Sequence, residues 1–117
     1  MSNQTMQIMG EDAAANHLQS LGYKIVARNW RVRMGEIDLV VTQGDTLVIV
    51  EVKARSPGSL APPYEAVGWV KQQRLRRLAE AYVVMERPTF ESCRFDVVSV
   101  VGNDKGVVTL EHLQDAF

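Results

Sequence analysis

The sequence is poor in cysteine, in long apolar runs and in net charge. Its single cysteine, Cys93, cannot form an intrachain disulfide, which excludes a disulfide scaffold and fits a reducing compartment. Uninterrupted apolar stretches are short, as at residues 47–50, whereas a membrane helix needs about 20 apolar residues. Residues 1–10 lack the basic and apolar regions of a secretory signal. We therefore expect a cytoplasmic protein with no membrane partner.

The chain has 117 residues, of which 46% are apolar and 23% charged, as is usual for one globular domain. We expect a short tail at residues 1–9 and the domain at residues 10–117. The net charge of −1 is unevenly divided, because residues 24–77 hold ten basic and five acidic side chains. Such a segment can face a polyanion although the total charge is near zero. Solvated helix surfaces explain the same charges, so charge alone leaves nucleic-acid binding open.

The apolar pattern along the chain predicts seven secondary-structure elements. Apolar residues at helical spacing predict helices over residues 10–21 and 65–86, with Glu11 in the first turn, where the helix dipole favours an acid. Stretches rich in β-branched residues predict strands at 23–31, 36–41, 47–53, 94–101 and 107–110. This order predicts an α/β sheet with helices packed on it. Trp30 and Trp69 are predicted to pack in the core.

The two clearest strands, 36–41 and 47–53, are joined by a segment that predicts a tight hairpin. If Gly44 and Asp45 are the two turn residues, Asp38 lies directly opposite Glu51. The same register places Glu36 opposite Lys53. Because side chains alternate along a strand, all four would share one face. Directly opposed residues have Cβ atoms about 4.5–5.5 Å apart.

Two opposed carboxylates destabilise a sheet unless something neutralises them. A divalent cation bound by Asp38 and Glu51 would do so, and oxygen ligands with few protein donors suit Mg²⁺ or Mn²⁺. Lys53, on the same face, would steady negative charge that develops on a substrate. This is the residue set of metal-assisted phosphodiester hydrolysis. A surface salt-bridge cluster, in which Lys53 pairs with the acids, explains the same pattern and is the alternative.

Several short motifs, in this order along the chain, carry a specific resemblance. They are Gly10-Glu11-x-x-Ala14, Asn29-x-Arg31, Gly35-Glu36-Ile37-Asp38-Leu39-Val40, Val50-Glu51-Val52-Lys53-x-Arg55, Ala66-Val67-x-x-x-Lys71-Gln72-x-Arg74-Leu75 and Arg94-Phe95-Asp96-Val97-Val98. Together they resemble the YraN family of small bacterial proteins, and the resemblance runs from about residue 10 to residue 113. That family is similar to the archaeal Holliday junction resolvases and to the PD-(D/E)XK nuclease-like group.

The resemblance implies a restriction-endonuclease-like αβββαβ core with a mixed sheet flanked by helices. It implies that Asp38 and Glu51 bind the metal, that Lys53 acts at the attacking water, and that Glu11 on the first helix completes the metal site. The proline of the group's name is absent, because Ile37 precedes Asp38.

The leading hypothesis from the sequence is a Mg²⁺- or Mn²⁺-dependent endonuclease that hydrolyses DNA phosphodiester bonds. Branched or junction structures are among its candidate substrates, and linear DNA is the alternative. The residues expected to contact nucleic acid are polar or basic: Arg31, Arg55, Lys71, Gln72, Arg74 and Arg77. For Lys71 and Gln72 the resemblance implies contact either with the metal site or with backbone phosphates. Paired cuts at a junction would require two copies of the chain, so a homodimer is a further expectation. The alternative is a non-catalytic nucleic-acid-binding or interaction module that retains the nuclease fold.

Overall fold

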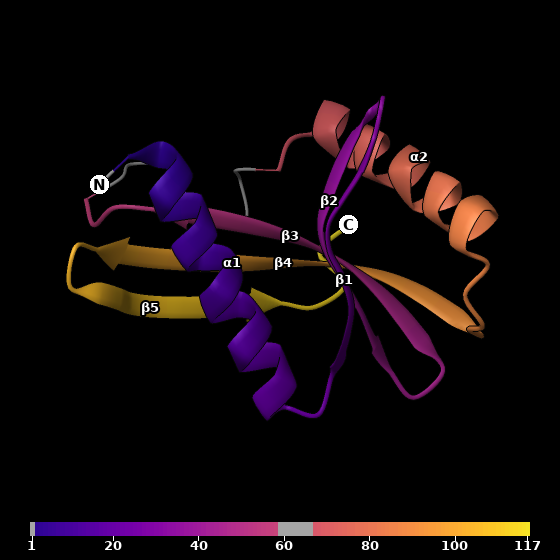
Figure 1. The fold of residues 1–117 in the computed structure, drawn as a ribbon, viewed down its shortest axis with the longest axis horizontal. Coiled ribbons are helices and arrows are strands. Elements are labelled where there is room, and N and C mark those ends of the chain that lie inside the picture. Colours follow the sequence, from indigo (N-terminus) through magenta and orange to yellow (C-terminus); the bar gives the residue numbers. More distant parts are fainter. Residues whose placement is uncertain (1, 59–66) are drawn as a thin grey trace.

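The computed structural model describes residues 2–58 and 67–117, which form one mixed sheet between two helices (Figure 1). The elements in chain order are α1 (Asn3–Ser20), β1 (Lys24–Val32), β2 (Gly35–Gln43), β3 (Thr46–Arg55), α2 (Trp69–Glu86), β4 (Ser92–Asn103) and β5 (Gly106–Leu113). The spatial strand order is β1-β2-β3-β4-β5. The β3–β4 pair is parallel and the other three pairs are antiparallel. The predicted α/β class and element order are confirmed.

The β2–β3 hairpin has the register that the turn residues predict. Gln43 pairs with Thr46 across the two-residue turn, and the pairing continues to Leu39 opposite Val50. The chain then crosses by α2 to β4, which lies parallel to β3 over ten paired positions starting at Thr46. Strand β3 is therefore enclosed between β2 and β4, which accounts for its continuous apolar stretch.

Helix α1 begins at Asn3, seven residues before the start that its apolar spacing predicts. Ser2 caps it, because its hydroxyl accepts a hydrogen bond from the Thr5 amide at 3.0 Å. Residues 3–9, expected in a tail, thus form the first turns of the helix. Glu11 lies in the middle of α1 and not in its first turn, so the helix-dipole explanation for Glu11 is wrong.

Gly10 allows α1 to approach β3 very closely. A Cβ atom added at this position would lie 2.7 Å from the Cβ of Ala54 on β3. Contacts this short require the backbone to move, so any larger residue pushes the helix away from the strand. The close approach brings the next residue, Glu11, to the carboxyl-terminal half of β3.

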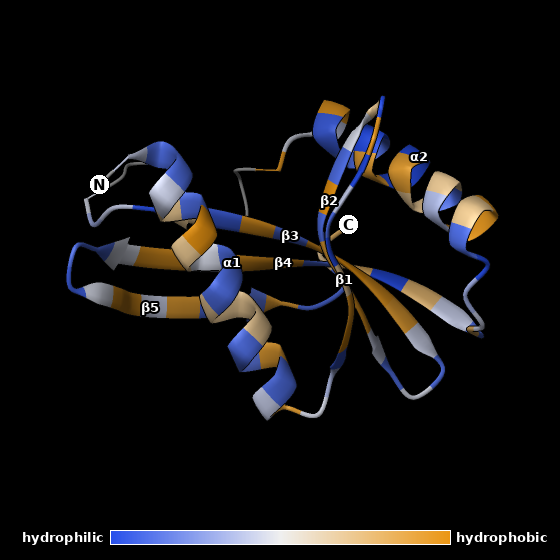
Figure 2. Cartoon of the chain, in the orientation of Figure 1, coloured by the Kyte–Doolittle hydropathy of each residue, from blue (hydrophilic) through white to orange (hydrophobic). Residues whose placement is uncertain are grey.

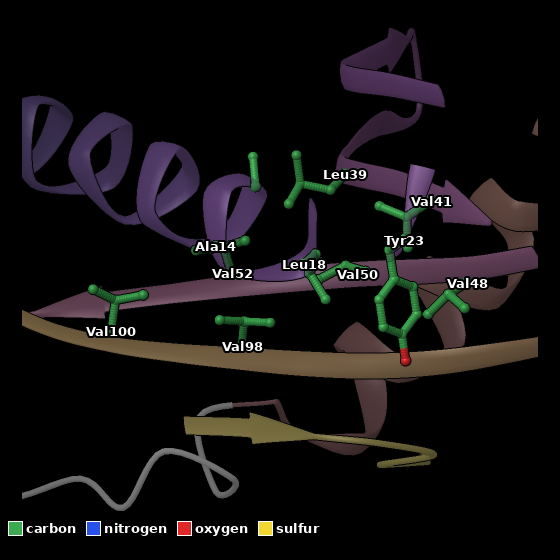
Figure 3. Packing of buried hydrophobic residues seen from close by; sticks show 11 residues of the cluster. Ala14, Leu18, Tyr23, Leu39, Val41, Val48, Val50, Val52, Val98 and Val100 are labelled. Atoms are coloured by element: carbon green, nitrogen blue, oxygen red, sulfur yellow. The ribbon is translucent and has the colours of Figure 1, made fainter. Parts of the chain in front are cut away.

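The two faces of the sheet bury separate apolar clusters. Figure 3 shows the cluster under α1, in which Ala14 and Leu18 pack on Leu39, Val50 and other valines of the sheet. The second cluster, under α2, consists of Ile37, Val40, Leu47, Ile49, Val67, Leu75, Leu78, Ala79, Tyr82, Phe95 and Val97. Both helices mix hydrophilic and hydrophobic residues along their length (Figure 2), and the buried ones include Ala14 and Leu18 of α1 and Leu75 and Leu78 of α2. Within the described parts of the chain, neither helix is long and apolar enough to cross a membrane.

Helix α2 begins at Trp69, and the start predicted at residue 65 lies outside the described residues. Trp69 is 71% exposed, so its predicted place in the core is wrong. Trp69 is the first residue of the helix, and the buried residues of α2 begin only at Leu75. Trp30 does pack on the α2 cluster, with its ring 5.2 Å from that of Tyr82.

A buried polar network centred on Asp96 links β4, β5 and the C-terminal residues. Asp96 on β4 is fully buried and accepts hydrogen bonds from Arg94 at 2.9 and 3.0 Å and from the Asp115 amide at 2.9 Å. The ring Nε2 of His112 lies 2.7 Å from the same carboxylate. Burial raises the pKa of Asp96, but these hydrogen bonds outweigh burial and leave the pKa below its usual value. The network ties β4 to β5 and to the C-terminal residues.

Candidate metal centre

Strands β2 and β3 separate where the two predicted acids lie. The described pairing ends at Leu39 opposite Val50, and the amide of Val52 then donates a 2.8 Å hydrogen bond to the Asp38 carboxylate. The side chain of Asp38 thus takes the place that a backbone carbonyl of β2 would have in a continued ladder. The sequence-based register predicts this juxtaposition of Asp38 and Glu51.

The predicted pairing of Glu36 with Lys53 is wrong, because the strands have already separated at that point. Glu36 instead accepts hydrogen bonds from the guanidinium of Arg31 on β1, the shorter at 2.6 Å. The Arg31–Glu36 pair therefore belongs to the β1–β2 hairpin.

The carboxyl groups of Asp38 and Glu51 are buried together, with relative exposures of 5% and 4%. Burial, a shared hydrogen bond with Glu51 and repulsion by its charge raise the pKa of Asp38 to about 9. The hydrogen bond from Val52 opposes this rise without cancelling it. At neutral pH the metal-free pair therefore holds a proton that an ordinary aspartate would have lost.

Two lysines face Glu51. The Nζ atom of Lys71, on α2, forms an ion pair with Oε2 of Glu51, and Nζ of Lys53 lies 4.0 Å from the same oxygen. Burial and the neighbouring Lys71 lower the pKa of Lys53. Burial also lowers the pKa of Lys71, but its hydrogen bond and attraction to Glu51 prevail and raise it. Of the two contacts that the resemblance left open for Lys71, the structure thus gives the one with the acidic pair.

Gln7 joins the third predicted acid to β3. Its side-chain Nε2 donates to Oε2 of Glu11 and to the backbone carbonyl of Val52, each at 3.1 Å. Glu11 is 4% exposed, and its negative charge contributes to the raised pKa of Asp38. Sequence reasoning missed Gln7 because the helix was predicted to begin after it. The four-residue spacing from Glu11 is the signal that an earlier helix start would have made visible.

Three clefts are lined by the acids or by residues that contact them. One of about 160 Å³, between β2 and α2, is lined by Asp38, Glu51 and the predicted contact residues Lys71 and Arg74. A second, of about 490 Å³ between α1 and the β1–β2 hairpin, is lined by Gln7, Glu11, Asn29, Arg31 and Glu36. A third, of about 540 Å³ at the end of β3, is lined by Gln7 and Arg55 among others.

Neighbouring clefts share a lining residue, Glu36 between the first and second and Gln7 between the second and third. Consecutive clefts therefore adjoin, and the first is the one that Asp38 and Glu51 line. Two predicted contact residues lie elsewhere: Gln72 donates to the Val67 carbonyl at 3.0 Å, and Arg77 lines a separate cleft beside Trp69.

The donor set fits a magnesium-type cation. Asp38, Glu51 and the Val52 carbonyl offer only oxygen, and Mg²⁺ is commonly held by one or two carboxylates with waters and substrate oxygens completing its shell. Among the described residues, no three His, Cys, Asp or Glu side chains converge as a metal-binding group. Glu11 therefore stands beside the two-carboxylate pair, joined to it through Gln7 and Val52.

Fold and site together define a small α/β domain with a sheet between two helices. Its acidic centre lies where the two strands of the β2–β3 hairpin separate. The sequence matches the uncharacterised protein family UPF0102 over residues 10–100. A UPF0102 protein of Dictyoglomus turgidum is 38% identical over the full length of both chains. UPF0102 proteins of Pelotomaculum thermopropionicum and an Arthrobacter species are 44% and 46% identical over about nine-tenths of each chain. The chain belongs to the UPF0102 family, also called YraN, as its motifs predict.

Proposed function

We propose that this protein is a Mg²⁺- or Mn²⁺-dependent endonuclease that hydrolyses DNA phosphodiester bonds. The observation that carries the proposal is the burial of Asp38 and Glu51 side by side at the fork of β2 and β3, with two lysine ammonium groups facing Glu51. A protein does not bury two carboxylates together without a partner for their charge, and perturbed acids in a cleft are typical of functional sites. The motif resemblance to the PD-(D/E)XK nuclease-like group supports the same chemistry.

Asp38, Glu51 and the Val52 carbonyl would hold the cation. When bound, such a cation lowers the pKa of a water and neutralises charge on the phosphoryl oxygens. Lys53 has its pKa lowered by burial, which suits it to orient a water beside the acids or to take up a proton from it. Lys71 carries a charge next to Glu51 and would contact a phosphate brought into the same cleft.

The adjoining clefts supply a surface for the nucleic-acid backbone. Arg74 lines the cleft that contains Asp38, while Arg31 and Arg55 line the clefts on the other side of Gln7. Guanidinium groups bind phosphates in two-pronged geometry, so these positions suit successive phosphates of a strand that passes the acids. Two copies of the chain would act together if the substrate is a junction that needs paired cuts.

A cleavage panel tests the proposal. End-labelled linear, nicked, flapped and four-way branched DNAs are incubated with the native chain, Asp38→Asn and Glu51→Gln, in Mg²⁺, Mn²⁺ or a chelator. We expect metal-dependent cleavage of at least one branched substrate by the native chain and its loss in both variants. Cleavage that survives both substitutions would contradict the assignment of the active site.

The second candidate is a non-catalytic module that binds nucleic acid with the same fold. The observation in its favour is the Lys71–Glu51 ion pair, which neutralises one acid without a metal. Such a module would bind branched DNA equally well in Mg²⁺ and in a chelator. Its affinity would fall with salt in proportion to the phosphate contacts of Arg74, Arg76 and Arg77. Affinity and salt dependence that stay unchanged when these arginines are removed would contradict this candidate.

A further inference from the structure

The side-chain amide of Gln7 connects the two oxygens that border the acidic pair on the α1 side. Its single nitrogen donates both hydrogens, one to the Glu11 carboxylate and one to the Val52 carbonyl, at equal distances of 3.1 Å. Val52 is the residue whose amide donates to Asp38. The peptide groups on both sides of the Val52 Cα are therefore fixed by side chains, one by Asp38 and one by Gln7.

Each hydrogen bond leaves its acceptor with further capacity. A backbone carbonyl has two lone pairs and a carboxylate about four, so the Val52 carbonyl and Glu11 can each accept from Gln7 and still face a cation or its bound water. The amide carries no net charge, so it adds no repulsion toward a cation. Carboxylates and carbonyls that bind metals are themselves commonly oriented by such outer hydrogen bonds.

The position of Gln7 on the helix explains how it reaches both groups. It lies one turn before Glu11 on the same face of α1, and the close approach of the helix at Gly10 brings that face against β3. Gln4, three residues earlier, lines the same cleft, but its side chain forms no hydrogen bond with the described residues. The helix therefore carries two glutamines in one cleft, of which only Gln7 bridges Glu11 to β3.

From this geometry we infer that Gln7 is a positioning residue that holds the Val52 carbonyl and Glu11 in the arrangement a small divalent cation requires. The inference rests on the proposed function, since it presumes that the acidic centre binds a cation. It assigns Gln7 a specific consequence, selectivity for Mg²⁺ over Ca²⁺. Mg²⁺ demands near-ideal octahedral geometry at about 2.0–2.1 Å, whereas Ca²⁺ accepts 6–8 oxygens in flexible arrangements at about 2.3–2.6 Å.

The test uses Mn²⁺ as the probe, and its binding is measured as the loss of the free-ion EPR signal. Mg²⁺ and Ca²⁺ are added as competitors. The proteins are the native chain, Gln7→Met and the matched control Gln4→Met. Methionine keeps the length of the side chain and removes the donor. We expect Gln7→Met to weaken Mn²⁺ and Mg²⁺ binding about 10–100-fold, to weaken Ca²⁺ less, and Gln4→Met to bind like the native chain. Urea unfolding confirms that both variants are folded.

The outcomes separate the two proposals. Native-like binding by Gln7→Met, or an equal loss for Mg²⁺ and Ca²⁺, would overturn the positioning role while leaving the metal site intact. An absence of Mn²⁺ binding by the native chain would overturn the proposed function, and the role of Gln7 with it.

Discussion

The buried pair Asp38 and Glu51 makes the stability of the metal-free protein depend on pH in an unusual direction. The pKa of Asp38 is raised from 3.8 to about 9, so between these values the folded chain holds a proton that the unfolded chain has lost. Stability falls with rising pH wherever the folded state binds more protons. The contribution of Asp38 is therefore fully present below pH 4 and is lost as the pH rises toward 9.

The substitution Asp38→Asn isolates this effect. The asparagine oxygen can still accept from the Val52 amide, and its NH₂ group can donate toward Glu51, so the variant imitates the protonated acid at every pH. One proton corresponds to at most about 1.4 kcal/mol of unfolding free energy per pH unit. The unfolding free energy of Asp38→Asn minus that of the native chain can therefore rise by at most about 4 kcal/mol between pH 5 and pH 8.

Urea unfolding followed by circular dichroism, in the presence of a chelator, measures this difference at each pH. We expect the unfolding free energy of Asp38→Asn to increase steadily relative to that of the native chain from pH 5 to 8. At pH 8 the variant should be the more stable protein. Asp12→Asn, which alters an exposed partner of Arg28, should run parallel to the native chain. Parallel curves for Asp38→Asn and the native chain would refute the raised pKa and the close contact of the two acids.

Three further predictions concern packing, the buried network and nucleic-acid contact. Gly10→Ala should lower the unfolding free energy by about 1–3 kcal/mol in urea, because its Cβ would overlap β3; an unchanged midpoint would contradict the close approach. Asp96→Ala should cost about 3–5 kcal/mol by leaving buried partners unpaired, whereas Asp12→Ala should cost less than about 1 kcal/mol; equal costs would refute the network's role. Arg74→Ala should reduce the salt slope of DNA binding by about 1. Arg87→Ala, just after the last residue of α2, should not; equal slopes in a fluorescence titration would exclude a phosphate contact at Arg74.

The parts of the fold that the sequence predicted are those governed by short-range rules. The turn at Gly44 fixes the β2–β3 register, and with it the meeting of Asp38 and Glu51. Extending the same register to pair Glu36 with Lys53 fails, because the Asp38 carboxylate replaces a backbone acceptor and the strands separate. A register argument treats strand pairing as continuous, so it cannot show that a side chain ends the ladder.

The contributions of the helices to the site were harder to predict. The apolar spacing that marks α1 begins near Gly10, and the polar turns before it are helical because Ser2 caps them. This earlier start is what brings Gln7 to Glu11. Lys71 was expected to contact either the metal site or a phosphate, and its ion pair with Glu51 depends on how α2 packs over the sheet. That tertiary arrangement has no short-range signal in the sequence.

The most direct test of the metal centre is a calorimetric titration of Mn²⁺ into the native chain, Asp38→Asn and the matched control Glu36→Gln. Glu36 lines the same cleft but is paired with Arg31, so its loss leaves the two-carboxylate pair intact. We predict saturable binding by the native chain and by Glu36→Gln, and none by Asp38→Asn. Equal binding by all three proteins, or no binding by the native chain, would contradict a metal site at Asp38 and Glu51.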